Sequence, residues 1–463
     1  MTIWTPRYDN LSRPLHTSLV SAFKEAIADG RLPVGTQLLP HRTLAHELGI
    51  SVHTVGKAYD ELKRLGLIDG HVGRGTYVLA PTLPSHQPYL MERGTNGTID
   101  LSISRPLIDH IHVDRMDAVL NNLSIGLDHD TYLACRPNVG LRSHREAGVD
   151  WLSRCQLDIS PESVIITNGV THGMAVALSA VTRPGDIVVT ESIVHHLIIS
   201  QCSYLGLRLQ GLEFDDQGLS PEAFEVACKN QDIKVYFSVP TVANPMATMM
   251  SEERRRQLVD IARRYDVFII EDDAWGPLIE DRPLPIAALA PERTIYLTSF
   301  TKCTLAGLRT GYIVAPDSLI PAITGRLIAF SWMGTPLVAE IASRWIKDGT
   351  ADELVHWQQQ ALAERYTIIK EEMAGLSWRG HPHSLHFWLE LPDGWNTTTY
   401  VNHANSLGIA IAPTQPFLTP TMQKADAVRI AVAGTQDTKR FRRGLSAIRN
   451  LLRRAPEPFM HSL

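Results

Sequence analysis

A lysine amine, a serine hydroxyl and an arginine guanidinium lie close together in one segment of this sequence. They are Lys302, with Ser299 three residues before it and Arg309 seven residues after it. A lysine amine can form an imine with an aldehyde, while a hydroxyl and a guanidinium hold a phosphate through hydrogen bonds and charge. The spacing therefore suits pyridoxal 5'-phosphate (PLP), an aldehyde cofactor that carries a phosphate. A Ser-x-x-Lys pattern by itself also describes a surface lysine, so the other segments must decide.

Two other segments supply groups that such a cofactor needs. Residues 167–174 follow a strand and open a helix, so the backbone amides near Val170 and Thr171 can bind the phosphate at the positive end of that helix. Asp272 ends an apolar strand, where its carboxylate can pair with a protonated pyridine nitrogen and keep the ring an electron sink. Solvation of a strand end is the simpler interpretation of Asp272.

Length, cysteine usage and hydropathy limit the class of protein. A chain of 463 residues exceeds what one hydrophobic core usually serves, which predicts two or three domains. Five cysteines without a Cys-x-x-Cys pair argue against a disulfide framework and a zinc ribbon, and we expect no metal site. Because we find neither an apolar signal core nor an apolar run of about 18 residues, we expect a cytoplasmic protein without a membrane partner.

Charge is unevenly distributed along the chain. Residues 1–80 hold nine Lys and Arg against seven Asp and Glu, so their formal charge is +2. Because the net charge of the chain is −5, the remaining residues carry −7. Five histidines in the same segment add positive charge below neutral pH. This asymmetry favours a nucleic-acid partner for the first 80 residues but is too small to identify one.

The first eighty residues predict three helices and a hairpin. Apolar spacing predicts a helix over 15–27, a second helix that ends at Gly49 and a third helix over 51–65. Residues 66–78 predict two short strands around a glycine hairpin. Two short helices joined by a glycine-containing turn make a helix-turn-helix candidate.

This segment resembles the winged helix-turn-helix of GntR-type transcription regulators. The resemblance lies in five runs in the family's order, which are Gly30–Gly35, Arg42–Ala45, Ser51–Ala58, Leu62–Ile68 and Gly73–Val78. It implies that the third helix enters the major groove of double-stranded DNA. The candidate DNA contacts are Arg42, Ser51, His53, Thr54, Lys57 and Arg74. The alternative for each is a solvated surface residue, and for Ser51 a helix cap.

The rest of the chain predicts an α/β fold. Residues 81–99 are rich in proline and glycine without a sustained period, as in an inter-domain linker. Beyond them, apolar strand-like runs alternate with helical stretches, which indicates a mostly parallel sheet covered by helices. The runs are 163–167, 185–190, 235–239, 267–271, 294–298 and 311–315. We expect a DNA-binding domain over 1–80, a large domain over 100–330 and a smaller α+β domain over 331–463.

The lysine segment and the order of the other motifs resemble the fold-type I aminotransferases. The whole chain resembles the MocR/GabR class of bacterial regulators, in which a GntR-like winged helix precedes an aminotransferase-like domain. The resemblance implies that Lys302 forms a Schiff base with PLP, that Asn244 donates to the cofactor's 3'-oxygen and that Arg429 clamps an α-carboxylate. It also implies a head-to-tail homodimer. The simpler interpretations are a turn for Asn244 and a surface ion pair for Arg429.

Three positions depart from the family pattern. Trp275 stands where relatives commonly place a tyrosine that bonds the cofactor's phenolic oxygen, and His195 stands where an aromatic ring normally stacks on the pyridine. Tyr132 lies in Tyr-Leu-Ala-Cys instead of Tyr-Gly-Asp-Pro, yet it retains the hydroxyl that would reach the phosphate of a neighbouring subunit. These substitutions preserve anchoring by Lys302 and Asp272, so the sequence supports cofactor binding better than turnover.

Three functions remain open on the sequence. The first is a PLP-dependent transcription regulator that senses an amino acid or an amine through exchange at Lys302. The second is a working aminotransferase, for which Lys302 must also move a proton from the substrate α-carbon. The third is a regulator of vitamin B6 genes that senses PLP itself.

Overall fold

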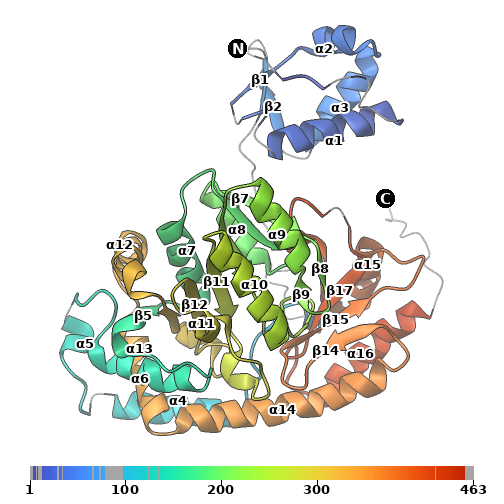
Figure 1. The fold of residues 1–463 in the computed structure, drawn as a ribbon. Helices are drawn as coiled ribbons and strands as arrows, with labels where there is room; N and C mark the ends of the chain where they lie inside the picture. Colours follow the sequence, from blue (N-terminus) through green and yellow to red (C-terminus); the bar gives the residue numbers. More distant parts are fainter. Residues whose placement is uncertain are drawn as a thin grey trace. The chain divides into compact units, whose positions relative to one another are not determined.

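The chain forms two compact units in the computed structural model, Met1–His86 and Gln87–Leu463, and each is described by itself (Figure 1). Arg74 and nearly all of the predicted linker over 81–99 lie outside the described residues. The described residues are 4–6, 8, 13–28, 31–33, 35–64, 67–71, 75–78, 97–123, 125–133, 135–422 and 424–453.

The first unit contains the predicted three helices and hairpin. Its helices are α1 (Leu15–Ala28), α2 (His41–Leu48) and α3 (Val52–Arg64), and its strands are β1 (Gln37–Leu38), β2 (Ile68–His71) and β3 (Gly75–Val78). The three strands form an antiparallel sheet in the order β1-β3-β2. The short sheet beside the helix pair α2–α3 is the wing of a winged helix.

Tyr59 on α3 organises the core of this unit. Its ring meets Phe23 of α1 edge-on at 5.8 Å, and its buried hydroxyl donates to the Leu39 carbonyl at 2.9 Å. Gly49 ends α2 because it takes the left-handed conformation, with φ of 63°, that favours glycine. The apolar face of α3 therefore points inward, and its other face remains in solvent.

The second unit contains a seven-stranded sheet whose strands follow the order β5-β13-β12-β11-β10-β6-β7. All neighbouring pairs are parallel except those that involve β13, which is antiparallel to both of its neighbours. The strands are β5 (Val164–Thr167), β6 (Ile187–Glu191), β7 (Arg208–Leu212), β10 (Ile233–Ser238), β11 (Phe268–Asp273), β12 (Thr294–Ser299) and β13 (Gly311–Val314). The six predicted runs are confirmed as strands, whereas the edge strand β7 was not predicted because its apolar residues are few.

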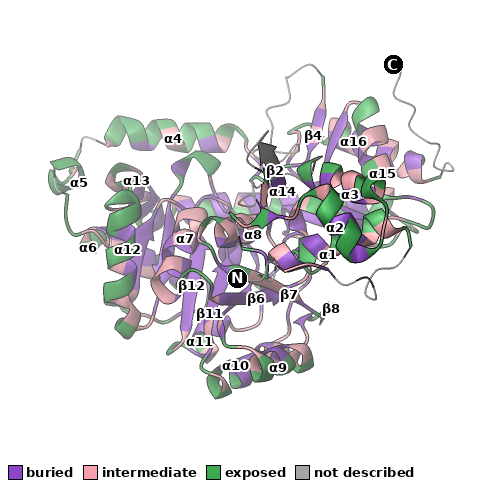
Figure 2. Cartoon of the chain, turned by 90° about the horizontal axis from the view of Figure 1, so that it is seen from above, coloured by how far each residue is buried: buried purple, intermediate pink, exposed green. Residues whose placement is uncertain are grey.

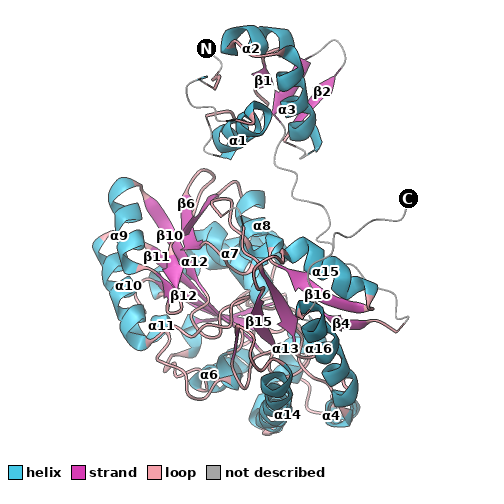
Figure 3. Cartoon of the chain, turned by 90° about the vertical axis from the view of Figure 1, so that its right-hand side faces the viewer, coloured by secondary structure: helices cyan, strands magenta, loops and turns pink. Residues whose placement is uncertain are grey.

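Helices cover both faces of this sheet (Figure 3). One face packs against α7 (Val170–Val181), α8 (His196–Tyr204) and α12 (Ile320–Ser331), and the other against α9 (Pro221–Asn230), α10 (Glu252–Arg264) and α11 (Ile286–Leu289). Apart from the edge strand β7, the strands between them are almost entirely buried (Figure 2). A sheet buried on both faces needs continuous apolar strands, and the sequence provides them.

A second sheet of five strands lies toward the carboxyl end of the chain, in the order β14-β15-β17-β16-β4. Its strands are β14 (Trp378–Gly380), β15 (His386–Glu390), β16 (Ile409–Pro413), β17 (Ala427–Ala431) and β4 (Ile99–Leu101). Strand β4 corrects an expectation. The sequence places Ile99 in the linker and residues 100–101 in the large domain, whereas Ile99–Leu101 pair in parallel with Ile409–Ile411 in this second sheet.

The remaining elements surround the two sheets. The other helices are α4 (His110–Asn122), α5 (Asp130–Leu133), α6 (Arg142–Ser153), α13 (Pro336–Lys347), α14 (Thr350–Glu372), α15 (Thr397–Ser406) and α16 (Thr438–Leu452). A small hairpin comprises β8 (Phe214–Asp215) and β9 (Gly218–Leu219), and the short 3-10 helices are η3 (Pro161–Ser163), η4 (Gly276–Leu278), η5 (Ala306–Leu308), η6 (Asp317–Leu319) and η7 (Gln415–Phe417).

Close approach of β13 to the loop after β5 yields a stability prediction. A Cβ added at Gly311 would lie 2.8 Å from the backbone of Gly169, so Gly311→Ala forces the strand and the loop apart. We expect it to lower the free energy of unfolding by about 1–3 kcal/mol, as overpacking does. Urea unfolding followed by tryptophan fluorescence measures this, since eight of the nine tryptophans lie in the second unit.

The matched control is Gly307→Ala, because a Cβ at Gly307 would meet nothing within 4 Å. It should change the unfolding free energy by no more than about 0.5 kcal/mol. Equal unfolding midpoints for the two variants would contradict the close packing of Gly311 against Gly169.

Candidate functional site

The first unit presents a polar face on α3. His53 and Lys57 are exposed, Thr54 is half-buried, and Arg42 is exposed on α2. Ser51 is exposed too, but its Oγ accepts a hydrogen bond from the Thr54 amide at 3.1 Å and thus caps the helix. The N-terminal part of α3 is therefore free of the core and available to a groove. Because Arg74 lies outside the described residues, its predicted DNA contact remains a prediction.

In the second unit, Lys302 lies in the loop between β12 and β13, at an end of the sheet where ligands of α/β folds bind. Its Nζ donates to the Ser104 carbonyl at 2.7 Å and lies 5.8 Å from the centre of the Trp275 ring. Burial, with Arg429 and Arg309 nearby, lowers the pKa of this amine from 10.5 to about 8. A substantial fraction of Lys302 is therefore a neutral nucleophile near physiological pH.

Asp272 is the penultimate residue of the neighbouring strand β11 and is buried. Burial, and then the adjacent Asp273, raise the pKa of Asp272 to about 7. His195 Nδ1 is 3.7 Å from Asp272 Oδ2, which is longer than a hydrogen bond. Burial and the charges of Lys302 and Arg429 lower the pKa of His195 to about 3, so the pair is not an ion pair. Asp272 is thus a buried acceptor that a cationic ring N–H would stabilise.

The residues predicted to hold a phosphate converge from two loops. Val170 and Thr171 begin α7, whose N-cap Gly169 provides no capping side chain. Arg309 Nη2 donates to the Asn168 carbonyl at 3.5 Å, and a Cβ on Gly169 would lie 2.9 Å from that same nitrogen. Gly169 therefore leaves space for the guanidinium beside a helix N-terminus, an arrangement that suits an anion.

Ser299 pairs in the sheet with Gly311, the first residue of β13. It ends β12, and its buried Oγ accepts a hydrogen bond from the Thr301 amide at 3.0 Å. The hydroxyl hydrogen remains available to donate to an anion.

Asn244 and Arg429 meet directly, although 185 residues separate them in the sequence. Arg429 Nη1 donates to Asn244 Oδ1 at 3.1 Å, and Nη2 donates to the Ser102 carbonyl. The first contact orients the Asn244 amide, because its oxygen faces Arg429 and its NH₂ group is left for another acceptor. Both side chains are buried, which excludes the simpler interpretation of Arg429 as a surface ion pair.

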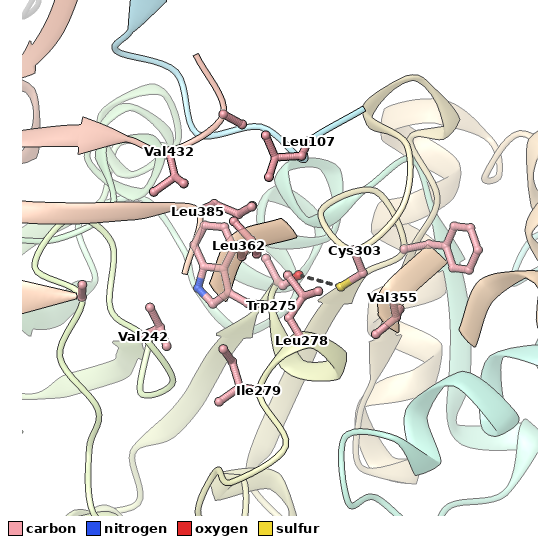
Figure 4. Close-up of a cluster of buried hydrophobic side chains, with 14 of the residues drawn as sticks. Leu107, Val242, Trp275, Leu278, Ile279, Cys303, Val355, Leu362, Leu385 and Val432 are labelled. Atoms are coloured by element: carbon pink, nitrogen blue, oxygen red, sulfur yellow. Dashed lines mark hydrogen bonds between the residues drawn. The ribbon is translucent and has the colours of Figure 1, made fainter. Parts of the chain in front are cut away.

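Trp275 is buried against Leu278 and Leu362, where Figure 4 shows its ring within the apolar cluster that also holds Cys303. Its Nε1 has no hydrogen-bond partner among the described residues. A buried N–H without an acceptor costs free energy, so this donor fits a site that a ligand oxygen completes.

One residue of the pocket was missed from the sequence. His386 on β15 is buried, its ring centre is 5.7 Å from that of Trp275, and its Nε2 lies 3.3 Å from the Ala243 carbonyl. Burial, and then the charge of Arg429, lower the pKa of His386 to about 3, so the ring is neutral. The signal available was a histidine within an otherwise apolar strand, which no motif singled out.

Tyr132 is not brought into this pocket within one chain. It lies on α5, at the outer edge of the second unit, 57% exposed, with its ring edge-on against His129 (Figure 1). A role for Tyr132 at the phosphate of a neighbouring subunit remains a prediction.

In the described part of the chain, no group of three or more His, Cys, Asp or Glu side chains is arranged to hold a metal ion. Within the same residues, no helix has both the length and the apolar character that crossing a membrane requires.

The lowered pKa of Lys302 predicts its pH-dependent reactivity. Acylation of the neutral amine by acetic anhydride should rise with pH, reach half its maximum near pH 8 and level off above about pH 9, since the pKa is about 8. Lys234 is an internal control, because its hydrogen bond with Asp232 raises its pKa above 10.5 and its labelling should still increase at pH 10. Peptide mass spectrometry reads both sites in one sample. Parallel pH profiles for the two lysines would contradict the account of Lys302.

Comparisons with known proteins agree with both units. Residues 96–448 match the family Aminotransferase class I and II, and residues 15–78 match the family Bacterial regulatory proteins, gntR family. The chain is 27% identical over 450 residues to the uncharacterized HTH-type transcriptional regulator YdeF of Bacillus subtilis, covering 97% of this chain and 96% of that protein. It is 28% identical to the HTH-type pyridoxine biosynthesis transcriptional regulator PdxR of Corynebacterium glutamicum, over 65% of this chain and 66% of PdxR.

A solved structure gives the same fold. The multiple substrate aminotransferase from Thermococcus profundus superposes with a TM-score of 0.70 at 21% identity, over 79% of this chain and 96% of that enzyme. The predicted fold class, a winged helix followed by a fold-type I aminotransferase-like domain, is therefore confirmed. The chain belongs to the aminotransferase class I and II family, which is generally PLP-dependent, and carries a gntR-family DNA-binding domain at its amino end, the arrangement of MocR/GabR-type regulators.

Proposed function

We propose that this protein is a transcription regulator that binds operator DNA through α3 and binds PLP and an amino compound in the pocket around Lys302. The observation that carries the proposal is that one chain combines both units. An aminotransferase has no need of a helix-turn-helix, and a simple repressor has no need of a buried lysine next to a buried arginine. Because the proposed partner is operator DNA, we place the protein in the cytoplasm.

The pocket residues fit PLP by their own chemistry. Asp272 would pair with the ring nitrogen, and Lys302 would hold the aldehyde carbon. Val170, Thr171, Ser299 and Arg309 would hold the phosphate. Asn244 and Trp275 would donate to the phenolic oxygen, and His195 would lie against the ring. When bound, PLP supplies an electron-withdrawing ring with an aldehyde that exchanges amines.

The effector we propose is an α-amino acid or a related amine. Arg429 is buried and offers a planar pair of N–H groups, the geometry that a carboxylate prefers. The site would recognise both ends of such a ligand. Its amino group would react with PLP in place of Lys302, and its carboxylate would bind Arg429. If the effector binds two conformations of the protein with different affinity, its binding shifts the population between them and so changes the affinity for DNA.

Two alternatives have support of their own. Transamination is favoured by the retained Lys302 amine, whose lowered pKa suits proton transfer at a substrate carbon. Sensing of PLP itself is favoured by the name of the relative PdxR, a pyridoxine biosynthesis regulator.

We propose further that two copies of the chain associate head to tail. Apolar side chains on α4, α5 and the intervening residues are exposed, which is costly for a monomer in water. They are Val113, Leu120, Ile125, Tyr132 and Leu133. A second copy covering this surface would also place Tyr132 against a neighbouring chain, where its predicted phosphate contact lies.

One experiment separates the three functions. Affinity for the DNA upstream of the neighbouring gene is measured by fluorescence anisotropy without ligand, with PLP, and with PLP plus each of a panel of amino acids, while keto acid is assayed in parallel. The proposal predicts a change in affinity that requires both PLP and one amino compound. A full response to PLP alone would establish the B6-sensing alternative. Keto acid released over many turnovers at enzyme-like rates, with DNA affinity unaffected, would reject regulation.

The DNA face generates a prediction for Lys57. If Lys57 neutralises a phosphate, Lys57→Ala weakens binding and reduces the slope of log K against log salt by about 1. Lys63→Ala is the matched control, since Lys63 is exposed near the carboxyl end of the same helix, away from the N-terminal residues that enter a groove. Anisotropy titrations across a salt series measure both slopes. Equal slopes for the two variants would make Lys57 an ordinary solvated residue.

A further inference from the structure

The segment Gly97–Pro106, here named the strap, is held along the second sheet of the second unit. Its β4 portion pairs with β16, and Arg440 of α16 donates to the carbonyls of Gly97 and Thr98 at 2.7 and 3.0 Å. Arg105 Nε donates to the Ala433 carbonyl at 3.3 Å. The strap therefore has a fixed course, which ends beside the pocket.

Two backbone carbonyl groups of the strap accept hydrogen bonds from Lys302, the proposed reactive amine, and from Arg429, the proposed carboxylate-binding residue. The Ser104 carbonyl accepts from Lys302 Nζ at 2.7 Å, and the Ser102 carbonyl accepts from Arg429 Nη2. Ser104 is only 7% exposed, and its Oγ has no hydrogen-bond partner among the described residues. The strap thus lies in direct contact with both Lys302 and Arg429, with one buried hydroxyl beside them that has no partner among the described residues.

Ligands of the proposed kind compete with these contacts. When the Lys302 amine forms an imine with an aldehyde, the aldehyde oxygen leaves as water and Nζ keeps at most one hydrogen, so it can no longer serve as the ammonium donor of Ser104. A carboxylate on the two terminal nitrogens of Arg429 competes for the N–H that Nη2 donates to Ser102, because a carboxylate is a stronger acceptor than a neutral carbonyl. Hydrogen bonds from charged groups are the stronger ones in a buried site, so losing either one weakens attachment of the strap.

We propose that the strap is the element through which occupancy of the pocket reaches the DNA-binding unit. PLP held by Lys302 releases the carbonyl of Ser104. An amino acid that takes the aldehyde carbon from Lys302 returns the lysine amine, and its carboxylate on Arg429 then competes with the carbonyl of Ser102, so each ligand state removes one attachment of the strap. In the sequence, the strap follows directly on residues 87–96, which lead back to the winged helix. This inference rests on the proposed function, since it assumes that PLP and an amino acid enter this pocket.

Hydrogen–deuterium exchange of the full-length protein tests it. Amides of Ile99–Arg105 are followed by mass spectrometry in the cofactor-free protein, with PLP, and with PLP plus the amino acid that alters DNA affinity. The strap should exchange about tenfold faster once ligands replace these charge-assisted bonds. Peptides from α10 should not change. Visible absorbance in the same samples reports whether PLP is bound.

Two variants make the test specific. Lys302→Met keeps the length of the side chain without its donor, so its strap should exchange faster without PLP and should not respond to PLP. Arg440→Ala is the matched control, because it removes bonds to Gly97 and Thr98 without altering a pocket cation. Its strap should exchange faster at the start yet accelerate further with ligands.

The outcomes separate the inference from the function it rests on. Absence of PLP absorbance would reject the proposed function. Bound PLP together with unchanged or slower strap exchange would overturn the strap inference alone.

Discussion

The second unit depends on the energetic cost of keeping cations out of water. The buried Arg429 and the exposed Arg309 both lie close enough to Lys302 to lower its pKa, and Asp272 beside them is a buried acid with a raised pKa. Burial and repulsion favour the neutral form of Lys302, which is the form that attacks an aldehyde. The same burial keeps His195 and His386 neutral, so no additional positive charge accumulates. The pocket is therefore suited to receive negative charge on a phosphate and a carboxylate.

The sheet explains how residues so distant in sequence meet. Asp272 and Ser299 lie at the carboxyl ends of the adjacent parallel strands β11 and β12, so both are at one edge of the sheet. Arg309 lies just before the antiparallel strand β13, whose first residue, Gly311, pairs with Thr167 at the end of β5, and Gly311 and Gly169 permit the close approach. Arg429 arrives from the second sheet and is fixed by Asn244. The side chains of this site thus come from several elements of both sheets.

Much of this was readable in the sequence because the signals were local. Buried parallel strands require uninterrupted apolar runs, and Lys302, Asp272 and the loop before Val170 follow such runs. The helices of the winged unit were visible from apolar spacing and from Gly49. Non-local contacts could not be predicted in this way. Nothing near Ser102 or Ser104 indicates that their carbonyls meet Arg429 and Lys302, and β4 contains too few residues to show that it pairs with β16. The burial of His386 likewise depends on packing between sheets.

We propose that Lys302 is the amine that holds the cofactor. The most direct test is to incubate the full-length protein with PLP, reduce it with borohydride to fix the cofactor to its amine, and map the added mass by peptide mass spectrometry. We expect the mass on the peptide that contains Lys302 and its loss in Lys302→Met. Stoichiometric labelling of a different lysine, or no labelling at saturating PLP, would contradict the account.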